Sequence, residues 1–320
     1  MSAVIELEGV VKEFTVARRA GRIRRHREVL RAVDGVSLSV EAGSMVGYIG
    51  PNGAGKSTTV KLCTGILVPT AGEVRVSGLD PSRTRVAVAR RIGVVFGQRT
   101  QLWWDLPLRD SLELLRHVYR VPADRYRSNL AELVKLLELE PFLHAPVRQL
   151  SLGQRMRGEL GAALLHDPDI LFLDEPTIGL DLVSKEAVRN CLITLNRERG
   201  VTVLLTTHDL VDVERLCGRL LIIDHGRLIE DSTVAEIRNR HGGERILVVE
   251  LEQPGPALAV PGTELIRTDG PRQWLRFRRA EHTAAAILAQ VAAQAPVRDL
   301  TIEDLPIEEI VRRIYQRPMP

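Results

Sequence analysis

The sequence has 320 residues, 44% of them hydrophobic and 27% charged, a composition typical of a globular chain that can bury a sizeable core. Its 44 basic and 41 acidic residues leave a formal net charge of +3, which excludes a protein that binds nucleic acid by bulk charge alone. The three cysteines lack CxxC spacing, which argues against a disulfide framework and a zinc site, and no apolar run approaches the ~18 residues of a membrane span.

The chain opens with two segments, 4–14 and 30–41, in which apolar and polar residues alternate. This pattern predicts antiparallel strands with one face in water. Between them, residues 17–31 carry seven arginines against the single acid Glu28. We interpret this stretch first as an extended, solvated hairpin tip. Contact with anionic lipid headgroups is the second interpretation, and contact with nucleic acid a distant third.

Three short apolar runs, at residues 45–49, 170–173 and 201–205, are each bounded by polar or glycine-rich turns. They predict buried strands of a mainly parallel sheet, because strands so uniformly apolar must be covered on both faces. Helical patterns follow each run, which is the signature of an α/β fold. The expected helices are 56–65, 184–197 and 210–217.

The pattern becomes helical between about residues 105 and 166, which predicts a helical subdomain inserted into the α/β core. Beyond residue 241 it changes again, to a small α+β unit, so we divide the chain into domains 1–241 and 242–320. In the second domain we expect strands at 245–252, 263–268, 273–278 and 297–302 and helices at 281–294 and 306–316.

A glycine-rich loop follows the first apolar run. Residues 50–57 satisfy the pattern GxxxxGK[ST], between a predicted strand and a predicted helix. Glycines let the backbone turn its N–H groups inward around an anion, and the helix N-terminus adds positive potential. Lys56 can reach the β- and γ-phosphates, and the Ser57 hydroxyl can ligate Mg²⁺. The expected nucleotide-binding residues are Gly50, Asn52, Gly53, Ala54, Gly55, Lys56, Ser57 and Thr58.

Two acids end the second apolar run. The buried strand at 170–173 delivers Asp174 and Glu175 to the carboxyl edge of the sheet, where ligands gather in such folds. We expect Asp174 to hold Mg²⁺ through water and Glu175 to act as the base that polarises the attacking water. The alternative, two solvent-exposed acids after a core strand, is common in general but disfavoured beside a phosphate loop.

Further motifs occur in a fixed order around these two, and together they give a family resemblance. The chain resembles an ATP-binding-cassette (ABC) ATPase, the nucleotide-binding subunit of an ABC transporter. The P-loop and the Asp174-Glu175 pair match that family, as do an adenine-stacking aromatic, a Q-loop glutamine, a signature close to LSGGQ, a D-loop and a switch histidine. These last five are Phe14, Gln98, residues 150–154, residues 179–181 and His208.

The resemblance implies a role for each motif. Ser151, Gly153 and Gln154 would form a second anion site that acts on the ATP of a partner copy, so two copies would sandwich two ATP molecules. Gln98 would sense Mg²⁺ and water, His208 would contact the γ-phosphate, and Asp181 would belong to the nucleotide site. The metal ligands would be Ser57, Gln98 and Asp174, and the catalytic residues Glu175, His208 and Gln98.

The sequence departs from the family pattern at Leu152, which replaces a glycine, and at Ile178 and Leu182 near the D-loop. If position 152 needed a positive φ, leucine there would cost roughly 1–2 kcal/mol. Trp103 and Trp104 follow the Q-loop at the edge of the helical subdomain. We expect one of them to be buried and the other to help form a groove for a helix of the membrane subunit.

The expected protein is therefore a cytoplasmic ABC ATPase, peripheral on the membrane, that dimerises on ATP and powers a separate transmembrane permease. The subfamily resemblance favours bacterial type-2 exporters of drugs and amphiphiles, with no nucleic acid partner. The alternative is a soluble ABC ATPase acting on ribosomes or DNA. It is disfavoured because the chain holds one cassette and no heptad helices.

Overall fold

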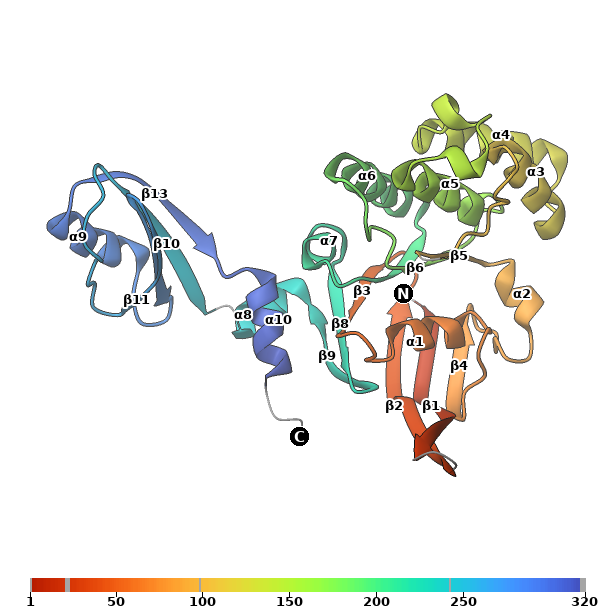
Figure 1. The fold of residues 1–320 in the computed structure, drawn as a ribbon, viewed down its shortest axis with the longest axis horizontal. Helices are drawn as coiled ribbons and strands as arrows, with labels where there is room; N and C mark the ends of the chain where they lie inside the picture. Colours follow the sequence, from red (N-terminus) through yellow and green to blue (C-terminus); the bar gives the residue numbers. More distant parts are fainter. Residues whose placement is uncertain (1, 21–23, 98, 242, 317–320) are drawn as a thin grey trace. The chain divides into compact units, whose positions relative to one another are not determined.

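The apolar runs of the sequence lie side by side in one sheet of the computed structural model, which describes residues 2–20, 24–97, 99–241 and 243–316 (Figure 1). β6 (Ile170–Asp174), β7 (Thr202–Thr206) and β3 (Met45–Ile49) are neighbours in parallel register. Every residue of β3 and β7 is buried, as expected for strands covered on both faces. The predicted parallel core is confirmed.

Three more strands complete this sheet, in the order β5-β6-β7-β3-β8-β9. β5 (Ile92–Phe96) pairs in parallel with β6, and β8 (Arg219–Asp224) pairs in parallel with β3, while β9 (Arg227–Thr233) forms the edge. A helix follows each strand of the central trio, which confirms the α/β prediction. These helices are α1 (Lys56–Cys63), α6 (Leu182–Arg199) and α7 (Leu210–Leu216).

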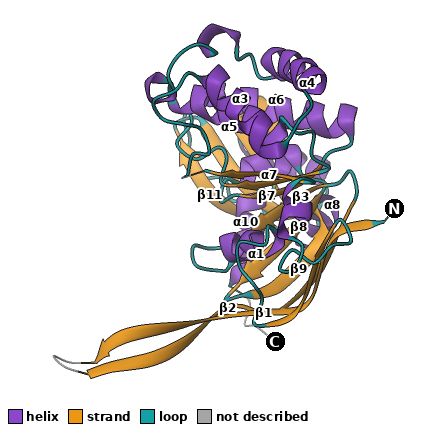
Figure 2. Cartoon of the chain, turned by 90° about the vertical axis from the view of Figure 1, so that its right-hand side faces the viewer, coloured by secondary structure: helices purple, strands orange, loops and turns teal. Residues whose placement is uncertain are grey.

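The opening segments form an antiparallel sheet of order β2-β1-β4. β1 (Ala3–Ala20) and β2 (Arg24–Glu41) pair along their whole length, and β4 (Ala71–Val76) lies on the other side of β1. The buried side chains of this sheet join those of β3 in one hydrophobic core. Figure 2 shows the paired ribbon running out beyond the rest of the sheet. The extended hairpin is thus confirmed, and residues 21–23 lie outside the described residues.

A group of helices lies on the side opposite to the hairpin (Figures 1 and 2). Prolines mark the starts of two of them, since Pro107 and Pro122 precede the first helical turns of α3 and α4. The predicted helical subdomain is present. It comprises α3 (Leu108–Tyr119), α4 (Ala123–Leu136), α5 (Leu152–Leu164) and two short 3₁₀ turns, Glu140–Phe142 and Val147–Gln149, whereas α2 (Arg85–Ala89) precedes β5.

The two adjacent tryptophans are both exposed, Trp103 by 40% and Trp104 by 50%, so the prediction that one is buried is wrong. They lie in a turn before α3, where neither side chain is directed by a regular element. The backbone of this turn is held by other groups: the Arg148 N–H donates to the Trp104 carbonyl at 3.0 Å. The Arg155 guanidinium lies 5.9 Å from the centre of the Trp104 ring.

The chain divides into two compact units, Met1–Asp231 and Ser232–Pro320, here called unit 1 and unit 2. The boundary predicted at residue 242 lies outside the described residues. α8 (Val234–His241) belongs to unit 2, where it packs against α10 (Ile307–Tyr315).

Unit 2 has the elements expected from the sequence. Its antiparallel sheet has the order β11-β12-β10-β13, and Ile287 and Val291 of α9 pack on its core. Within the described part of the chain, no helix combines the length and the apolar character that spanning a bilayer requires. The elements of this unit are β10 (Glu244–Leu251), β11 (Thr263–Asp269), β12 (Arg272–Arg278), α9 (Ala284–Gln294) and β13 (Val297–Asp304).

Candidate active site

The glycine-rich loop joins β3 to α1, and two of its glycines have no room for a side chain. A Cβ on Gly50 would lie 2.4 Å from the carbonyl oxygen of Ile223, and one on Gly55 would lie 2.3 Å from that of Ala32. Gly55 also has φ 110°, a left-handed conformation that L side chains rarely adopt. The glycines are therefore required by the packing of this loop against its neighbours.

Lys56 is the first residue of α1, and its ammonium group lies inside the loop. Its Nζ donates to the carbonyl oxygens of Gly50 at 2.7 Å and Pro51 at 3.2 Å. The residue is only 7% exposed, and this burial lowers the pKa of Lys56, while the carboxylates of Glu175 and Asp174 act to raise it. A cation is thus held where the phosphates of a nucleotide would lie.

Asp174 ends β6 and connects the loop to the neighbouring strand. Its Oδ1 accepts hydrogen bonds from the Ser57 hydroxyl at 3.1 Å and from the Thr206 hydroxyl at 2.5 Å. A hydroxyl and a carboxylate are the oxygen donors that Mg²⁺ prefers, so the donor set fits this ion. Gln98, the third expected metal ligand, lies outside the described residues.

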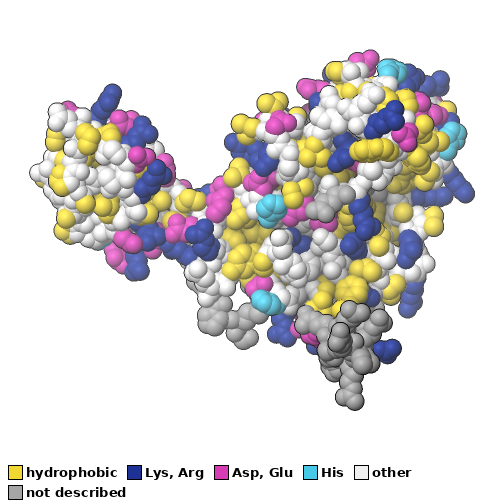
Figure 3. All heavy atoms as spheres, viewed as in Figure 1, with side chains coloured by type: hydrophobic (Ala, Val, Ile, Leu, Met, Phe, Trp, Pro, Cys, Tyr) yellow, Lys and Arg dark blue, Asp and Glu magenta, His cyan; other side chains and the backbone are white. Residues whose placement is uncertain are grey.

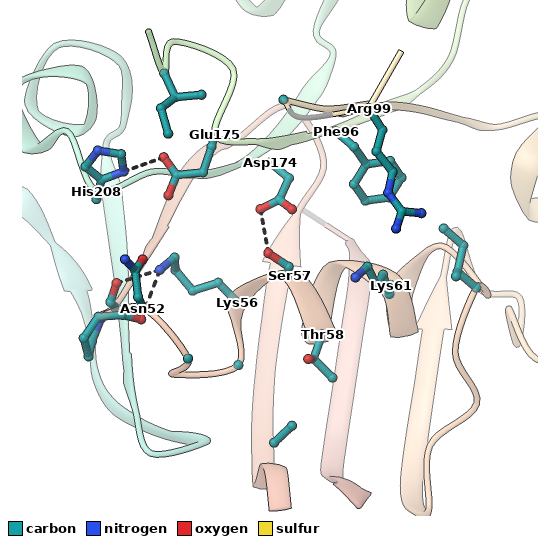
Figure 4. Close-up of a pocket in the computed structure, with 18 residues that line it drawn as sticks. Asn52, Lys56, Ser57, Thr58, Lys61, Phe96, Arg99, Asp174, Glu175 and His208 are labelled. Atoms are coloured by element: carbon teal, nitrogen blue, oxygen red, sulfur yellow. Dashed lines mark hydrogen bonds and ion pairs between the residues drawn. The ribbon is translucent and has the colours of Figure 1, made fainter. Parts of the chain in front are cut away.

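Glu175 and His208 form a close pair across the ends of β6 and β7. Nδ1 of His208 lies 2.7 Å from Oε2 of Glu175, and Figure 4 shows the two side chains above Lys56. Glu175 has φ 57°, an unusual conformation for a residue with a side chain, at the point where the strand ends. The arrangement places a carboxylate and an imidazole together at one side of the phosphate loop.

These groups line a single cleft of about 830 Å³ (Figure 4). The structure thus brings together most of the residues expected from the loop and the strand ends. The cleft also holds residues that the sequence reasoning did not assign to it, among them Lys61, Phe96 and Arg99. Lys61 could have been found, because it lies four residues after Ser57 on the same helix and so shares its face.

Phe14 does not line this cleft. It lies partly buried on β1, opposite Leu30 of β2, and the Lys12 ammonium lies 5.3 Å from the centre of its ring. The stacking of adenine on Phe14 therefore stays a prediction.

The signature residues also lie outside the cleft of their own chain, at the start of α5. The Ser151 hydroxyl accepts from the Gln154 N–H at 3.2 Å, and the Gln154 side chain accepts from the Ser151 N–H at 2.9 Å. This capping box fixes the first turn of the helix. Leu152 has no positive φ, so the strain considered for this substitution does not arise.

The D-loop aspartate caps the next helix. Asp181 accepts from the Ser184 N–H at 2.9 Å and from the Ser184 hydroxyl at 2.8 Å, and these bonds lower the pKa of Asp181. Ser184 in turn lies against the backbone of Gly153. Gly153 of the signature is therefore linked to Asp181 of the D-loop through Ser184 within one chain.

Comparison with known proteins gives a consistent result. A family model described as "ABC transporter" matches residues 33–178. The daunorubicin resistance ATP-binding protein DrrA3 of Streptomyces coeruleorubidus is 36% identical over 285 residues, which are 88% of this chain and 90% of that protein. The methionine import ATP-binding protein MetN 2 of Enterococcus faecalis is 35% identical over 239 residues, 73% of this chain and 66% of that protein.

A solved structure with the same fold is a dimeric ATP-binding cassette in a post-hydrolysis state, bound to ADP and Pi. It superimposes with a TM-score of 0.61 at 29% identity and covers 72% of this chain and 98% of its own. The 285 residues aligned with the drug-resistance protein exceed the length of unit 1, so that similarity continues into unit 2.

Proposed function

Because this chain belongs to the ABC transporter family as an ATP-binding and ATP-hydrolysing subunit, we propose that two copies close on two ATP molecules and drive a separate membrane permease. One observation supports the proposed dimer most directly. Ser151 and Gln154 form a capped helix N-terminus, with the positive potential that attracts a phosphate, yet neither residue lines the cleft of its own chain. A second copy supplies the phosphate that this helix end would meet.

In each composite site, Lys56 binds the β- and γ-phosphates, and Ser57 and Asp174 hold Mg²⁺. The ion, when bound, supplies charge neutralisation at the phosphates. Glu175 accepts a proton from the attacking water, whose oxygen bonds to the γ-phosphorus while the bond to ADP breaks. His208, already 2.7 Å from Glu175, orients that water and contacts the γ-phosphate. Gln98 and Phe14 keep the roles that the family resemblance gives them.

The permease is the partner that the family implies, and it places the protein on the cytoplasmic face of the membrane. We propose export of a drug or an amphiphile as the transport direction. Support comes from the drug-resistance relative, whose similarity extends into unit 2, whereas the import relative matches fewer residues. Co-purification of the permease from membranes, followed by transport into inside-out vesicles, tests this direction.

The alternative, an ATPase acting on ribosomes or DNA, gains no support from the charge distribution. Among the side chains coloured in Figure 3, on the face that it shows, basic side chains are interspersed with acidic ones over both units. Binding of nucleic acid through the phosphate backbone needs a continuous basic surface.

The composite site has a decisive test in two variants. Ser151→Arg fills the space for the partner's γ-phosphate and leaves the P-loop intact, so it abolishes hydrolysis while ATP still binds to the monomer. Lys56→Ala instead weakens ATP binding itself. Mixing the two inactive proteins creates dimers with one intact site, and partial activity returns. Normal ATPase activity of Ser151→Arg overturns the proposal, because a signature acting across the interface cannot survive that substitution.

A further inference from the structure

The segment that follows β5 is fixed at its start to the catalytic end of β6. The Gly97 N–H donates to the Asp174 carbonyl at 2.8 Å. A Cβ on Gly97 would lie 2.5 Å from the carbonyl oxygen of Glu175, so only glycine allows this approach. Gly97 therefore cannot move independently of the two catalytic-site acids.

Three residues later the same segment is fixed to a different element, the signature helix α5. The Thr100 hydroxyl donates a hydrogen bond to one carboxylate oxygen of Glu159, and the Gln101 N–H donates to the other at 3.2 Å. The Gln101 side chain also donates to the Glu159 carbonyl at 3.2 Å. Both residues of the segment are thus bound to one position of the helix.

Glu159 is an unusual residue to find at this position, because it is only 4% exposed. A buried carboxylate is costly unless its oxygens are hydrogen-bonded, so the contacts with Thr100 and Gln101 must persist while the helix stays packed. Burial raises the pKa of Glu159, and the hydrogen bonds from Thr100 and Gln101 oppose that rise. The hydrogen bonds of Thr100 and Gln101 with Glu159 therefore fix the segment after β5 to helix α5, and we call this contact the joint.

The joint at Thr100 is close in sequence to the other attachment of this segment, the hydrogen bond from Gly97 to Asp174. Because three extended residues span at most about 10 Å, Gly97 and Thr100 lie within about 10 Å of each other. On the other side of Glu159, the rigid helix runs eight residues back to Ser151, about 12 Å at 1.5 Å per residue. A short connected path therefore runs from the end of β6, through Thr100 and Glu159, to Ser151 at the start of α5.

We propose that Glu159 is a positioning residue that, through Thr100, holds the signature helix in register with the catalytic end of β6. The inference rests on the proposed function, since it concerns where Ser151 is presented to a second copy. It assigns no contact with nucleotide to Glu159. The inference predicts that breaking the contact between Thr100 and Glu159 lowers turnover and leaves ATP binding unchanged.

Two tryptophans lie next to the joint, so tryptophan fluorescence can report changes there. The Leu102 N–H donates to the Thr100 hydroxyl oxygen at 3.1 Å, and Trp103 and Trp104 follow directly. The protein has three tryptophans, and the third, Trp274, lies in unit 2. In a Trp274→Phe background, the tryptophan fluorescence reports the segment that the joint holds.

The matched pair of variants is Thr100→Val and Thr100→Ser. Valine keeps the shape but removes the hydroxyl, whereas serine keeps the hydroxyl and serves as the control. We expect Thr100→Val to lower kcat at least tenfold, to change the Kd for ATP less than twofold, and to abolish the change in tryptophan fluorescence on ATP addition. Thr100→Ser should retain kcat and the fluorescence change. Glu159→Gln, which keeps the size but loses one acceptor oxygen, should fall between the two.

A Thr100→Val protein with normal kcat and a normal fluorescence change overturns the inference, as does equal loss in Thr100→Ser. If Thr100→Val fails to fold, Glu159→Gln decides by the same two measurements. Failure of the composite site would be visible separately. In that case Ser151→Arg stays active, whereas failure of this joint leaves Ser151→Arg inactive and Thr100→Val active.

Discussion

Gly153 lies against Ser184 so closely that a Cβ on Gly153 would be 2.1 Å from the Ser184 hydroxyl oxygen and 2.6 Å from its Cβ. The contact joins the first turn of α5 to the first turn of α6, and Ser184 is itself held by Asp181. Gly153 of the signature is therefore a packing requirement inside one chain, in addition to any role it has toward a phosphate.

We predict that Gly153→Ala separates the two helix starts and lowers both the Tm and the ATPase rate. Replacing Ser184 by glycine removes the atoms that the new methyl group meets. The double variant Gly153→Ala, Ser184→Gly should therefore recover part of the Tm lost in Gly153→Ala. A double variant whose losses are the sum of the single losses would show that the contact with Ser184 is not the cause.

The parallel core, the helical subdomain and the phosphate loop were all predictable from the sequence, because each depends on a local pattern. Apolar runs mark the buried strands, and glycines mark the turn at which the backbone approaches Ile223 and Ala32. The capping box at Ser151 and Gln154 also follows from residue types three positions apart.

The contacts between distant elements were not predictable in this way. Glu159 meets Thr100 across 59 positions, and nothing in the residues around either one signals the other. The exposure of both tryptophans was missed because their turn is ordered by backbone bonds, such as that from Arg148 to Trp104, rather than by a helix or strand. Local patterns of residue types do not indicate which residues far apart in the sequence will be in contact.

Glu175→Gln should bind ATP, turn it over at a rate reduced by about two to three orders of magnitude, and accumulate as an ATP-bound dimer. Glutamine keeps the size of the side chain and can hydrogen-bond His208, but it cannot accept the proton from water. Size-exclusion chromatography with and without ATP measures the dimer. Turnover near the wild-type rate would remove Glu175 from its assigned role.

Asp212 forms a buried ion pair with Arg189, and the exposed fractions of the two side chains are 0% and 5%. It also accepts a hydrogen bond from the Thr177 hydroxyl. Asp212→Ala leaves a buried guanidinium without this partner, so we expect a loss of about 3–5 kcal/mol in the free energy of unfolding, measured by denaturant titration. Arg215→Gln breaks an exposed pair with Glu186 and should cost less than about 1 kcal/mol. Equal losses of stability in Asp212→Ala and Arg215→Gln would show that burial of the Asp212–Arg189 pair does not set the cost of breaking it.

The buried Glu159 predicts a pH dependence of stability. Its pKa is raised above the ordinary value of 4.5, so the folded chain keeps this proton at pH values where the unfolded chain has released it. Raising the pH from about 4.5 through the raised pKa therefore favours unfolding. Glu159→Gln has no such proton, so its Tm minus that of the wild type should increase over this range and then level off. A difference independent of pH would show that the carboxyl does not titrate there.

The last prediction concerns Lys185, whose ammonium lies 2.6 Å from the carboxylate of Asp209, the residue next to His208. Burial acts to raise the pKa of Asp209, but the hydrogen bond and charge of Lys185 bring it below its usual range. Asp209 also caps α7 by accepting from the Val211 N–H at 3.1 Å.

Removing the ammonium leaves a negative charge beside the Glu175–His208 pair and loosens the turn that aims the imidazole. Lys185→Met should therefore lower kcat about tenfold, equivalent to ~1.4 kcal/mol of transition-state stabilisation, while the Kd for ATP stays unchanged. Lys185→Arg keeps the charge and should retain most of kcat. An equal loss in both variants would indicate that shape matters at this position rather than charge, and an unchanged kcat in Lys185→Met would show that His208 is positioned without this pair.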